Sequence, residues 1–245
     1  MILLERTSVM NLENAVRGAR NPMNSWNRSD SYYNEANEYV LGPNDLGLAM
    51  RLRQAGSDHR KFIRQIFVSV DITAPLYWWK EYDTYKVATV ANSTSTMHKI
   101  HAKEFILDDF SWEQLLNNGN DLFNYEFGKG NYATQIQPLQ FLTNFIIPSL
   151  NECRELYLKT KDKRFWWQMI QLLPSSYNQR ATLMLNYEVL ANMYHARKNH
   201  KLDEWREFCA WIETLPYAEE LIICPTINNM PISPLLDPNY KVGEQ

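Results

Sequence analysis

The sequence predicts an α+β fold in which helices dominate. Apolar residues recur at the three-and-four spacing of amphipathic helices through most of the chain, whereas the alternation typical of half-buried strands is confined to the N-terminal half. The chain has 245 residues, enough for one large domain or two small ones. We expect a single domain over residues 1–223. Residues 224–245 contain several prolines and no periodicity, which predicts an extended tail.

Composition narrows the classes of protein to consider. Hydrophobic residues make up 45% of the chain, which supports a buried core, and a net charge of −3 gives no electrostatic basis for direct nucleic-acid binding. Eight glycines include no glycine-rich phosphate loop. The three cysteines form no Cys-x-x-Cys pair and are typical of reduced thiols in the cytoplasm, where we expect the protein to be. No membrane span or signal peptide is expected either.

In the first hundred residues the pattern alternates between strands, helices and turns. A polar, aromatic segment over residues 21–36 has no periodicity and is interpreted either as a surface loop or as a lid over a substrate. The expected elements are a strand over residues 2–6, a helix over 11–20, a helix over 44–55, a strand over 62–72 and a helix that starts at Pro75 and continues to Val90.

After residue 100 the predicted elements are all helices. Asn-Gly and Gly-Lys-Gly segments mark turns between residues 117 and 131. The expected helices cover residues 112–117, 138–160 with a break at Pro148, 163–172 and 202–215, and residues 218–223 are expected to end the fold.

The segment Leu173–Arg197 is the one around which we expect the fold to be organised. Its Leu-Pro start ends the preceding helix, and the apolar run that follows predicts one long buried helix. Polar residues interrupt this run on different sides, and a buried polar group costs about 1–3 kcal/mol unless it is paired. The helix therefore either meets polar partners from other elements or borders a ligand. The interrupting residues are Arg180, Asn186, Glu188, Asn192 and Arg197.

The same segment resembles the C-terminal signature of flavin-dependent thymidylate synthases, in which a Leu-Pro precedes a long helix with spaced Asn and Arg residues. The resemblance extends to Asp71–Pro75, which is similar to the lead-in to that family's R-H-R-x-x-S-x-N-E-x-S-x-R motif. Here the motif falls on residues 84–96 and departs from the family in its charged positions. Thr84, Tyr85, Asn92 and Thr96 replace the first Arg, the His, the Glu and the last Arg, while Lys86 stands for the second Arg.

The resemblance implies a helix-rich fold with a small, mainly antiparallel sheet, and a homotetramer with its sites between subunits. It implies FAD as cofactor, a pyrimidine deoxynucleotide as ligand and, in an active enzyme, a reduced folate as the one-carbon donor for a flavin-dependent methyl transfer. Arg197 would polarise the pyrimidine. The implied cofactor-binding residues are Asn186, Asn192, Lys86 and Gln65, and the implied substrate-binding residues are Arg180, Tyr85, Asn92, Thr94 and Thr96.

The lost charges leave a second interpretation open. The family also carries an Arg ahead of its Leu-Pro, and here that position is occupied by Ile170. Each lost phosphate contact removes about 1.5–3 kcal/mol, so the chain is either an enzyme with an altered ligand or a non-catalytic descendant that senses nucleotides or binds proteins. The Arg and Asn residues of the central segment could equally satisfy carbonyls of their own chain.

Two further patterns have ordinary structural explanations. The adjacent tryptophans at 78–79 and 166–167 could stack on a flavin, but adjacent aromatics on amphipathic helices more often pack in a core or a subunit interface. His98 and His101 stand three residues apart near Glu104, a spacing too common to predict a metal site, and none is predicted.

Overall fold

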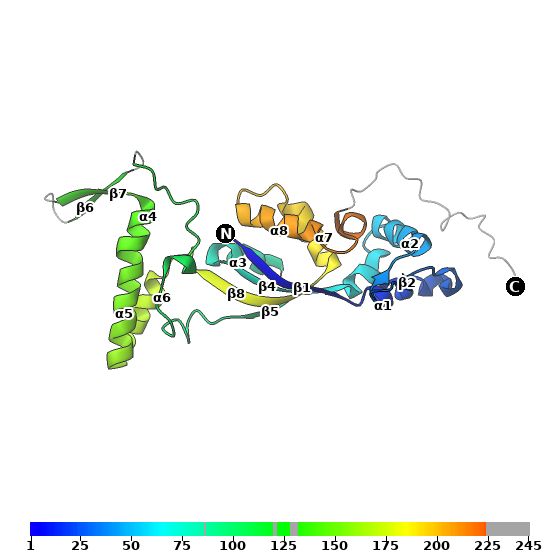
Figure 1. Ribbon diagram of the computed structural model, residues 1–245, viewed down its shortest axis with the longest axis horizontal. Coiled ribbons are helices and arrows are strands. Elements are labelled where there is room, and N and C mark those ends of the chain that lie inside the picture. The colour runs from blue at the N-terminus through cyan, green and yellow to red at the C-terminus, as the bar shows by residue number, and fades with distance from the viewer. Residues whose placement is uncertain (86, 120–121, 128–131, 224–245) are drawn as a thin grey trace. The chain divides into compact units, whose positions relative to one another are not determined.

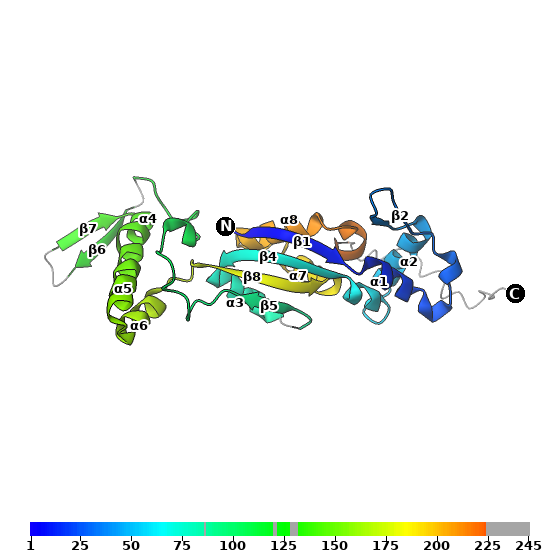
Figure 2. The ribbon, with the colours of Figure 1, turned by 60° about the horizontal axis from the view of Figure 1, so that its bottom comes forward.

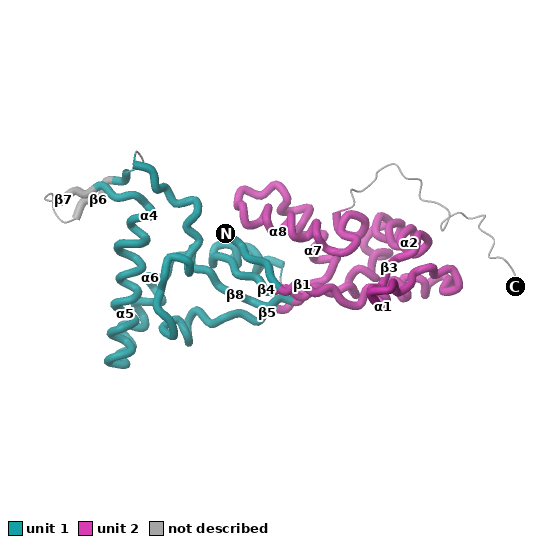
Figure 3. Tube along the Cα trace, viewed as in Figure 1, with its two compact units in different colours: residues 1–5, 71–86, 91–183 teal, residues 6–70, 87–90, 184–245 magenta. Residues whose placement is uncertain are grey.

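The computed structural model describes residues 1–85, 87–119, 122–127 and 132–223 (Figure 1). The predicted tail and Lys86 therefore lie outside the described residues. The chain divides into two compact units, coloured separately in Figure 3. Unit 1 comprises residues 1–5, 71–86 and 91–183, and unit 2 comprises residues 6–70, 87–90 and 184–245.

Helices form most of the structure, as the sequence predicts. The helices are α1 (Leu12–Ala19), α2 (Pro43–Gln54), α3 (Leu76–Tyr82), α4 (Pro138–Phe141), α5 (Ile147–Thr160), α6 (Lys163–Leu172), α7 (Tyr187–Arg197) and α8 (Asp203–Glu213). Short helical turns are η1 (Asn21–Met23), η2 (Trp26–Arg28), η3 (Arg60–Gln65), η4 (Asp83–Tyr85), η5 (Leu107–Asp109), η6 (Leu142–Ile146) and η7 (Glu219–Ile223).

A small, mainly antiparallel sheet contains four strands in the order β1-β4-β8-β5 (Figure 2). Its strands are β1 (Leu3–Met10), β4 (Phe67–Pro75), β5 (Val90–Ser93) and β8 (Asn178–Asn186). The pairs β2 (Tyr32–Tyr33) with β3 (Tyr39–Val40), and β6 (Phe123–Phe127) with β7 (Tyr132–Ile136), form separate two-stranded ribbons. Each strand of the four-stranded sheet contributes residues to both units.

The prediction of one helix over Leu173–Arg197 is wrong in its first half. Residues Asn178–Asn186 form strand β8, and α7 begins only at Tyr187. Along β8 the buried Ala181, Leu183 and Leu185 alternate with exposed residues. This is the two-residue period of a strand that buries one face. In the sequence the alternation lies within a short apolar run, and periodicity in so short a run does not distinguish a strand from a helix.

Other boundaries also differ from the prediction. The helix expected to continue to Val90 ends at Tyr82, and residues 112–117 form turns. The expected strand over 62–72 begins only at Phe67, because Arg60–Gln65 form a 3-10 turn. Pro148 does not break the helix over 138–160; it occupies the first turn of α5, immediately after the π-helical η6, where a missing N–H costs little.

Unit 1 has its core beside the long helix α5. Helices α5 and α6 pack side by side (Figure 1) against an apolar cluster built around Leu150, Phe110 and Met169. The position at which the family carries an Arg, Ile170, packs against this same cluster. Trp78 and Trp79 are buried, and the Trp78 ring stacks on Tyr82 with centroids 5.3 Å apart. These two tryptophans are therefore core residues.

Unit 2 is organised around α7 and α8. Leu190 and Met193 of α7 and Trp205, Phe208 and Ile212 of α8 are fully buried. The end of η7 is held against this core by a guanidinium, since Arg53 donates from Nε to the carbonyl of Leu221 at 2.8 Å and from Nη2 to that of Ile222 at 3.2 Å.

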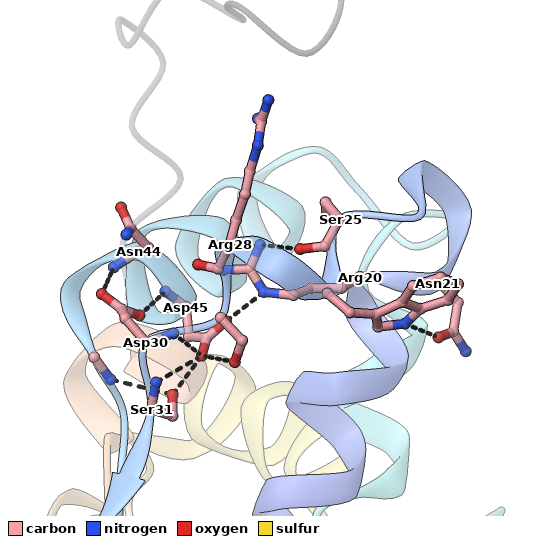
Figure 4. Close-up of polar contacts among 11 residues, drawn as sticks. Arg20, Asn21, Ser25, Arg28, Asp30, Ser31, Asn44 and Asp45 are labelled. Carbon is pink, nitrogen blue, oxygen red and sulfur yellow. Dashed lines mark hydrogen bonds and ion pairs between the residues drawn. The ribbon is translucent and has the colours of Figure 1, made fainter. Parts of the chain in front are cut away.

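The segment over residues 21–36 is held in place by one buried ion pair, which we call the Arg20–Asp45 clasp (Figure 4). Arg20 Nε donates to Asp45 Oδ1 at 2.5 Å, and its two Nη atoms donate to the carbonyls of Ser25 and Arg28. The hydroxyls of Ser29 and Ser31 and the amides of Asp30 and Ser31 donate to Asp45 Oδ2. The segment is thus attached to α1 and α2 by buried polar contacts.

Candidate functional site

The predicted site residues fall into two sets, one in each unit. Lys86 lies outside the described residues. Unit 1 holds the predicted substrate-binding residues Tyr85, Asn92, Thr94, Thr96 and Arg180, and unit 2 holds the predicted cofactor-binding residues Gln65, Asn186 and Asn192 together with Arg197.

In unit 1, Arg180 is paired with acidic neighbours on the sheet. Its Nη2 lies 2.8 Å from Asp71 Oδ2 and 3.5 Å from Glu5 Oε2, and the paired contacts raise its pKa further. The other oxygen of Asp71 accepts a hydrogen bond from Thr182 Oγ1 at 2.6 Å. Asp71 is 8% exposed, so its burial requires these partners. The positive charge of Arg180 is therefore largely offset on the protein itself.

The pairing of β5 with β8 brings Thr94 next to Arg180. The Thr94 amide donates to the Arg180 carbonyl at 2.8 Å, and Gln179 Nε2 donates to the Thr94 carbonyl at 2.6 Å. Asn92 is exposed on the same edge strand. Tyr85 ends η4 and is half-buried, as is Thr96. This edge of the sheet offers uncharged hydrogen-bonding groups to a ligand.

In unit 2, two predicted cofactor residues lie on segments that are hydrogen-bonded to each other where α7 begins. The amide of Tyr187 donates to the carbonyl of Ile66 at 3.1 Å, which places Asn186 beside the end of η3 and hence near Gln65. Gln65 is exposed, and its carbonyl accepts a hydrogen bond from Asn11 Nδ2.

Asn186 caps helix α7. Its Oδ1 accepts from the amide of Val189 at 3.0 Å, which satisfies one of the free N–H groups of the first turn. Among the described residues, its Nδ2 makes no hydrogen bond. The cap role thus uses the oxygen of Asn186 and leaves its two N–H donors for another partner.

The predicted residues of α7 lie on two sides of the helix. Glu188, Asn192 and His195 are separated by about 40° and 60° around the axis, so they share one stripe, whereas Arg197 is about 140° from Asn192. Asn192 is exposed. The guanidinium of Arg197 lies over the buried Trp205 ring of α8, 4.9 Å from its centroid.

Glu188 is the feature of this stripe that sequence reasoning assigned to no site. It is 9% exposed, and its Oε1 accepts from Arg60 Nε at 2.9 Å and from Nη2 at 2.7 Å. Its other oxygen, Oε2, is closed off from solvent and has no hydrogen-bond partner among the described residues. A buried carboxylate oxygen without a donor is unusual in a folded protein.

His195, one turn further along the same stripe, lies in a positively charged environment. Burial lowers the pKa of His195, and the charges of Arg53, Lys198 and Arg60 lower it further, against a hydrogen bond to the Ile222 carbonyl that raises it. The positive charges at this end of the stripe favour a neutral His195 and neutral or anionic groups on a ligand.

One signal for the missed residues was present in the sequence. Asp71 and Glu188 are acidic residues inside apolar runs, where a charge needs a partner. Their partners stand 109 and 128 residues away, at Arg180 and Arg60, so no local pattern identifies them.

Metal binding has no support within the described ranges, where no group of three or more His, Cys, Asp and Glu side chains is placed to hold an ion. His101 instead packs edge-on against Tyr157. Across the same ranges, none of the helices combines the length and apolar character that crossing a bilayer requires.

Comparison with known proteins gives a match in structure only. No family model matches the sequence, and no curated protein matches it. The fold matches thymidylate synthase X from Helicobacter pylori, solved with FAD and dUMP, with a TM-score of 0.58 and 15% identity over 93% of this chain and 99% of that one. It also matches the UMP/dUMP methylase PolB from Streptomyces cacaoi, bound with 5-Br dUMP, with a TM-score of 0.56 and 13% identity over 91% of this chain and 95% of that one.

The chain therefore has the fold of flavin-dependent thymidylate synthases, as the resemblance of residues 71–96 and 173–197 implied. At this level of identity the match establishes the fold alone.

Proposed function

We propose that the protein binds a pyrimidine deoxynucleotide, with FAD as its cofactor, on this scaffold. One observation carries the proposal: the structural match extends over 93% of the chain and nearly all of an enzyme solved with both molecules. A likeness limited to one unit would not support both ligands.

Unit 2 has groups that suit a flavin. Asn186 Nδ2 and the exposed Asn192 are donors without partners among the described residues. Glu188 Oε2 is a buried acceptor that also has no hydrogen-bond partner among them. These three residues with Gln65 would hold the ring, and bound reduced flavin would supply hydride. In an active enzyme, a reduced folate would supply the one-carbon unit.

Unit 1 has groups that suit a pyrimidine. Tyr85, Asn92, Thr94 and Thr96 would hydrogen-bond the base and sugar, and Arg180 would meet the nucleotide while Asp71 holds its guanidinium in one orientation. Lys86 would contact a phosphate, and Arg197 would polarise the pyrimidine. We propose a homotetramer as the functional assembly.

A second candidate function is a non-catalytic nucleotide-sensing or protein-binding module. Two observations favour it. Ile170 packs in an apolar cluster where the family would place an Arg, and the charge of Arg180 is offset by Asp71 and Glu5. Both reduce the positive charge available to phosphates.

The experiment that separates the two is ligand binding by the purified protein. The proposal predicts a flavin absorption band, or uptake of added FAD, and a rise in melting temperature with dUMP. Colourless protein that takes up no FAD and shows no shift with dUMP would support the non-catalytic module instead. Arg197→Ala is expected to abolish nucleotide binding in calorimetry without changing the assembly seen by light scattering; unchanged affinity would refute the role of Arg197.

A further inference from the structure

The carboxylate of Glu188 presents a buried acceptor that nothing in the described part of the chain satisfies. We propose that Glu188 Oε2 accepts a hydrogen bond from the imide N–H of the bound ring, the N3–H that flavin and uracil share. The inference rests on the proposed function, because it names the group through which a ligand of that site is recognised.

The two oxygens of Glu188 differ in their surroundings. Oε1 takes both contacts from the Arg60 guanidinium, which balances the charge of the carboxylate, while Oε2 accepts nothing within the described residues. An ionised carboxylate only accepts hydrogen bonds, so the missing partner must be a donor. Leaving such a group unsatisfied costs more than an ordinary hydrogen bond gains, which favours a ligand that supplies the donor.

The groups around Oε2 narrow the donor to an imide. Asn186 Nδ2, two residues before Glu188 at the cap of α7, and the remaining N–H groups of Arg60, which contacts the other oxygen of Glu188, are donors on neighbouring residues. An imide edge has one N–H between two carbonyls, so it matches an acceptor accompanied by donors. Cytosine has an unprotonated N3 at the same position, which would face the carboxylate with a lone pair. Where the ring against Glu188 is the pyrimidine, the site should therefore discriminate against cytosine.

The location agrees with the predicted ligand residues. Glu188 lies two residues after Asn186 and one turn before Asn192 on the same stripe of α7, and Arg60 begins η3, which ends at Gln65. Gln65 and Asn192 are both exposed, so this part of the predicted site is open to a ligand.

The test uses ligands methylated at the imide nitrogen and needs no variant of the protein. Dissociation constants are measured by calorimetry for FAD and N3-methyl-FAD, and for dUMP and 3-methyl-dUMP. We expect methylation to weaken binding of one of the two pairs by about 10- to 100-fold, because a hydrogen bond to a charged group is lost. The pair that responds identifies whether the flavin or the pyrimidine lies against Glu188.

Two variants assign the effect to the residue. In Glu188→Gln the methylation penalty should shrink to less than about threefold, because the parent ligand has lost its charged acceptor. Glu213→Gln, the same change on an exposed carboxylate of α8 that contacts Tyr194, should keep the full penalty.

The outcomes distinguish this inference from the function on which it rests. If the parent ligands bind and neither methylated ligand is weakened, Glu188 does not read an imide and the inference falls alone. An equal penalty in the wild type and in Glu188→Gln would also overturn it. If neither FAD nor dUMP binds, the proposed function fails and the inference with it.

Discussion

At the scale of single residues, the fold depends on carboxylates placed inside apolar elements. Asp71 in β4 and Glu188 in α7 are each about nine-tenths buried, and each is held by an arginine from a distant part of the chain. Removing one partner of such a pair leaves the other charge without compensation, and this costs more than the net gain from the pair.

Asp71→Ala is therefore expected to lower the free energy of unfolding by about 1–3 kcal/mol, since Thr182 loses its acceptor and Arg180 its nearest carboxylate. Urea denaturation monitored by tryptophan fluorescence measures this change. Asp58→Ala, at an exposed position, serves as the control and should have almost no effect. Equal stability of the two variants would show that the Asp71 contacts do not stabilise the sheet.

At the scale of elements, the start of α7 joins stability to the candidate site. Asn186→Ala should destabilise the protein by about 1 kcal/mol because it removes the helix cap. Asn186→Ser keeps a capping oxygen and should recover most of this stability, but it lacks the Nδ2 donors and should still bind FAD more weakly. Flavin fluorescence titration and thermal unfolding together measure both effects. Full FAD affinity in the Ser variant would exclude Nδ2 as a ligand contact.

The Arg20–Asp45 clasp predicts acid sensitivity. Burial would raise the pKa of Asp45, but hydrogen bonds from Ser31, Ser29 and Arg20 outweigh it and hold the pKa below its usual value. A carboxyl group with a lowered pKa in the folded state contributes stability above its unfolded pKa of about 3.9, and that stability is lost as the pH falls through the folded pKa.

Asp45→Asn should therefore reduce the free energy of unfolding at neutral pH. Below pH ~4 the free energy of unfolding should fall less steeply in this variant than in the wild type. Urea midpoints measured from pH 7 to pH 3 test this, with Asp83→Asn as the exposed control. Parallel pH profiles of the wild type and Asp45→Asn would contradict the role of the clasp.

The boundaries of these elements show what the sequence could predict. Helices α1, α2, α5, α6 and α8 have long periodic patterns or clear end signals, and their positions were predictable. Strand β8 was not, because its alternation runs directly into the apolar face of α7 and Asn186 looks like an interior residue until its cap bond is seen.

At the scale of the whole molecule, a few aligned residues predicted the fold better than composition did. The resemblance rested on the spacing of Pro174, Asn186, Asn192 and Arg197, whereas the solved proteins of this fold share only about 15% of their residues with the chain. The candidate site was less predictable. Its ion pairs join residues more than a hundred positions apart, and such contacts follow from the tertiary fold, not from local pattern.

Binding of a uracil nucleotide by this scaffold is the property on which the proposed function depends most. Calorimetric titration of the purified full chain, in the presence of FAD, with dUMP and separately with dCMP tests it directly. We expect saturable binding of dUMP and at least tenfold weaker binding of dCMP, about 1.4 kcal/mol. Absence of measurable heat with dUMP, at protein concentrations where light scattering shows an intact assembly, would contradict the claim.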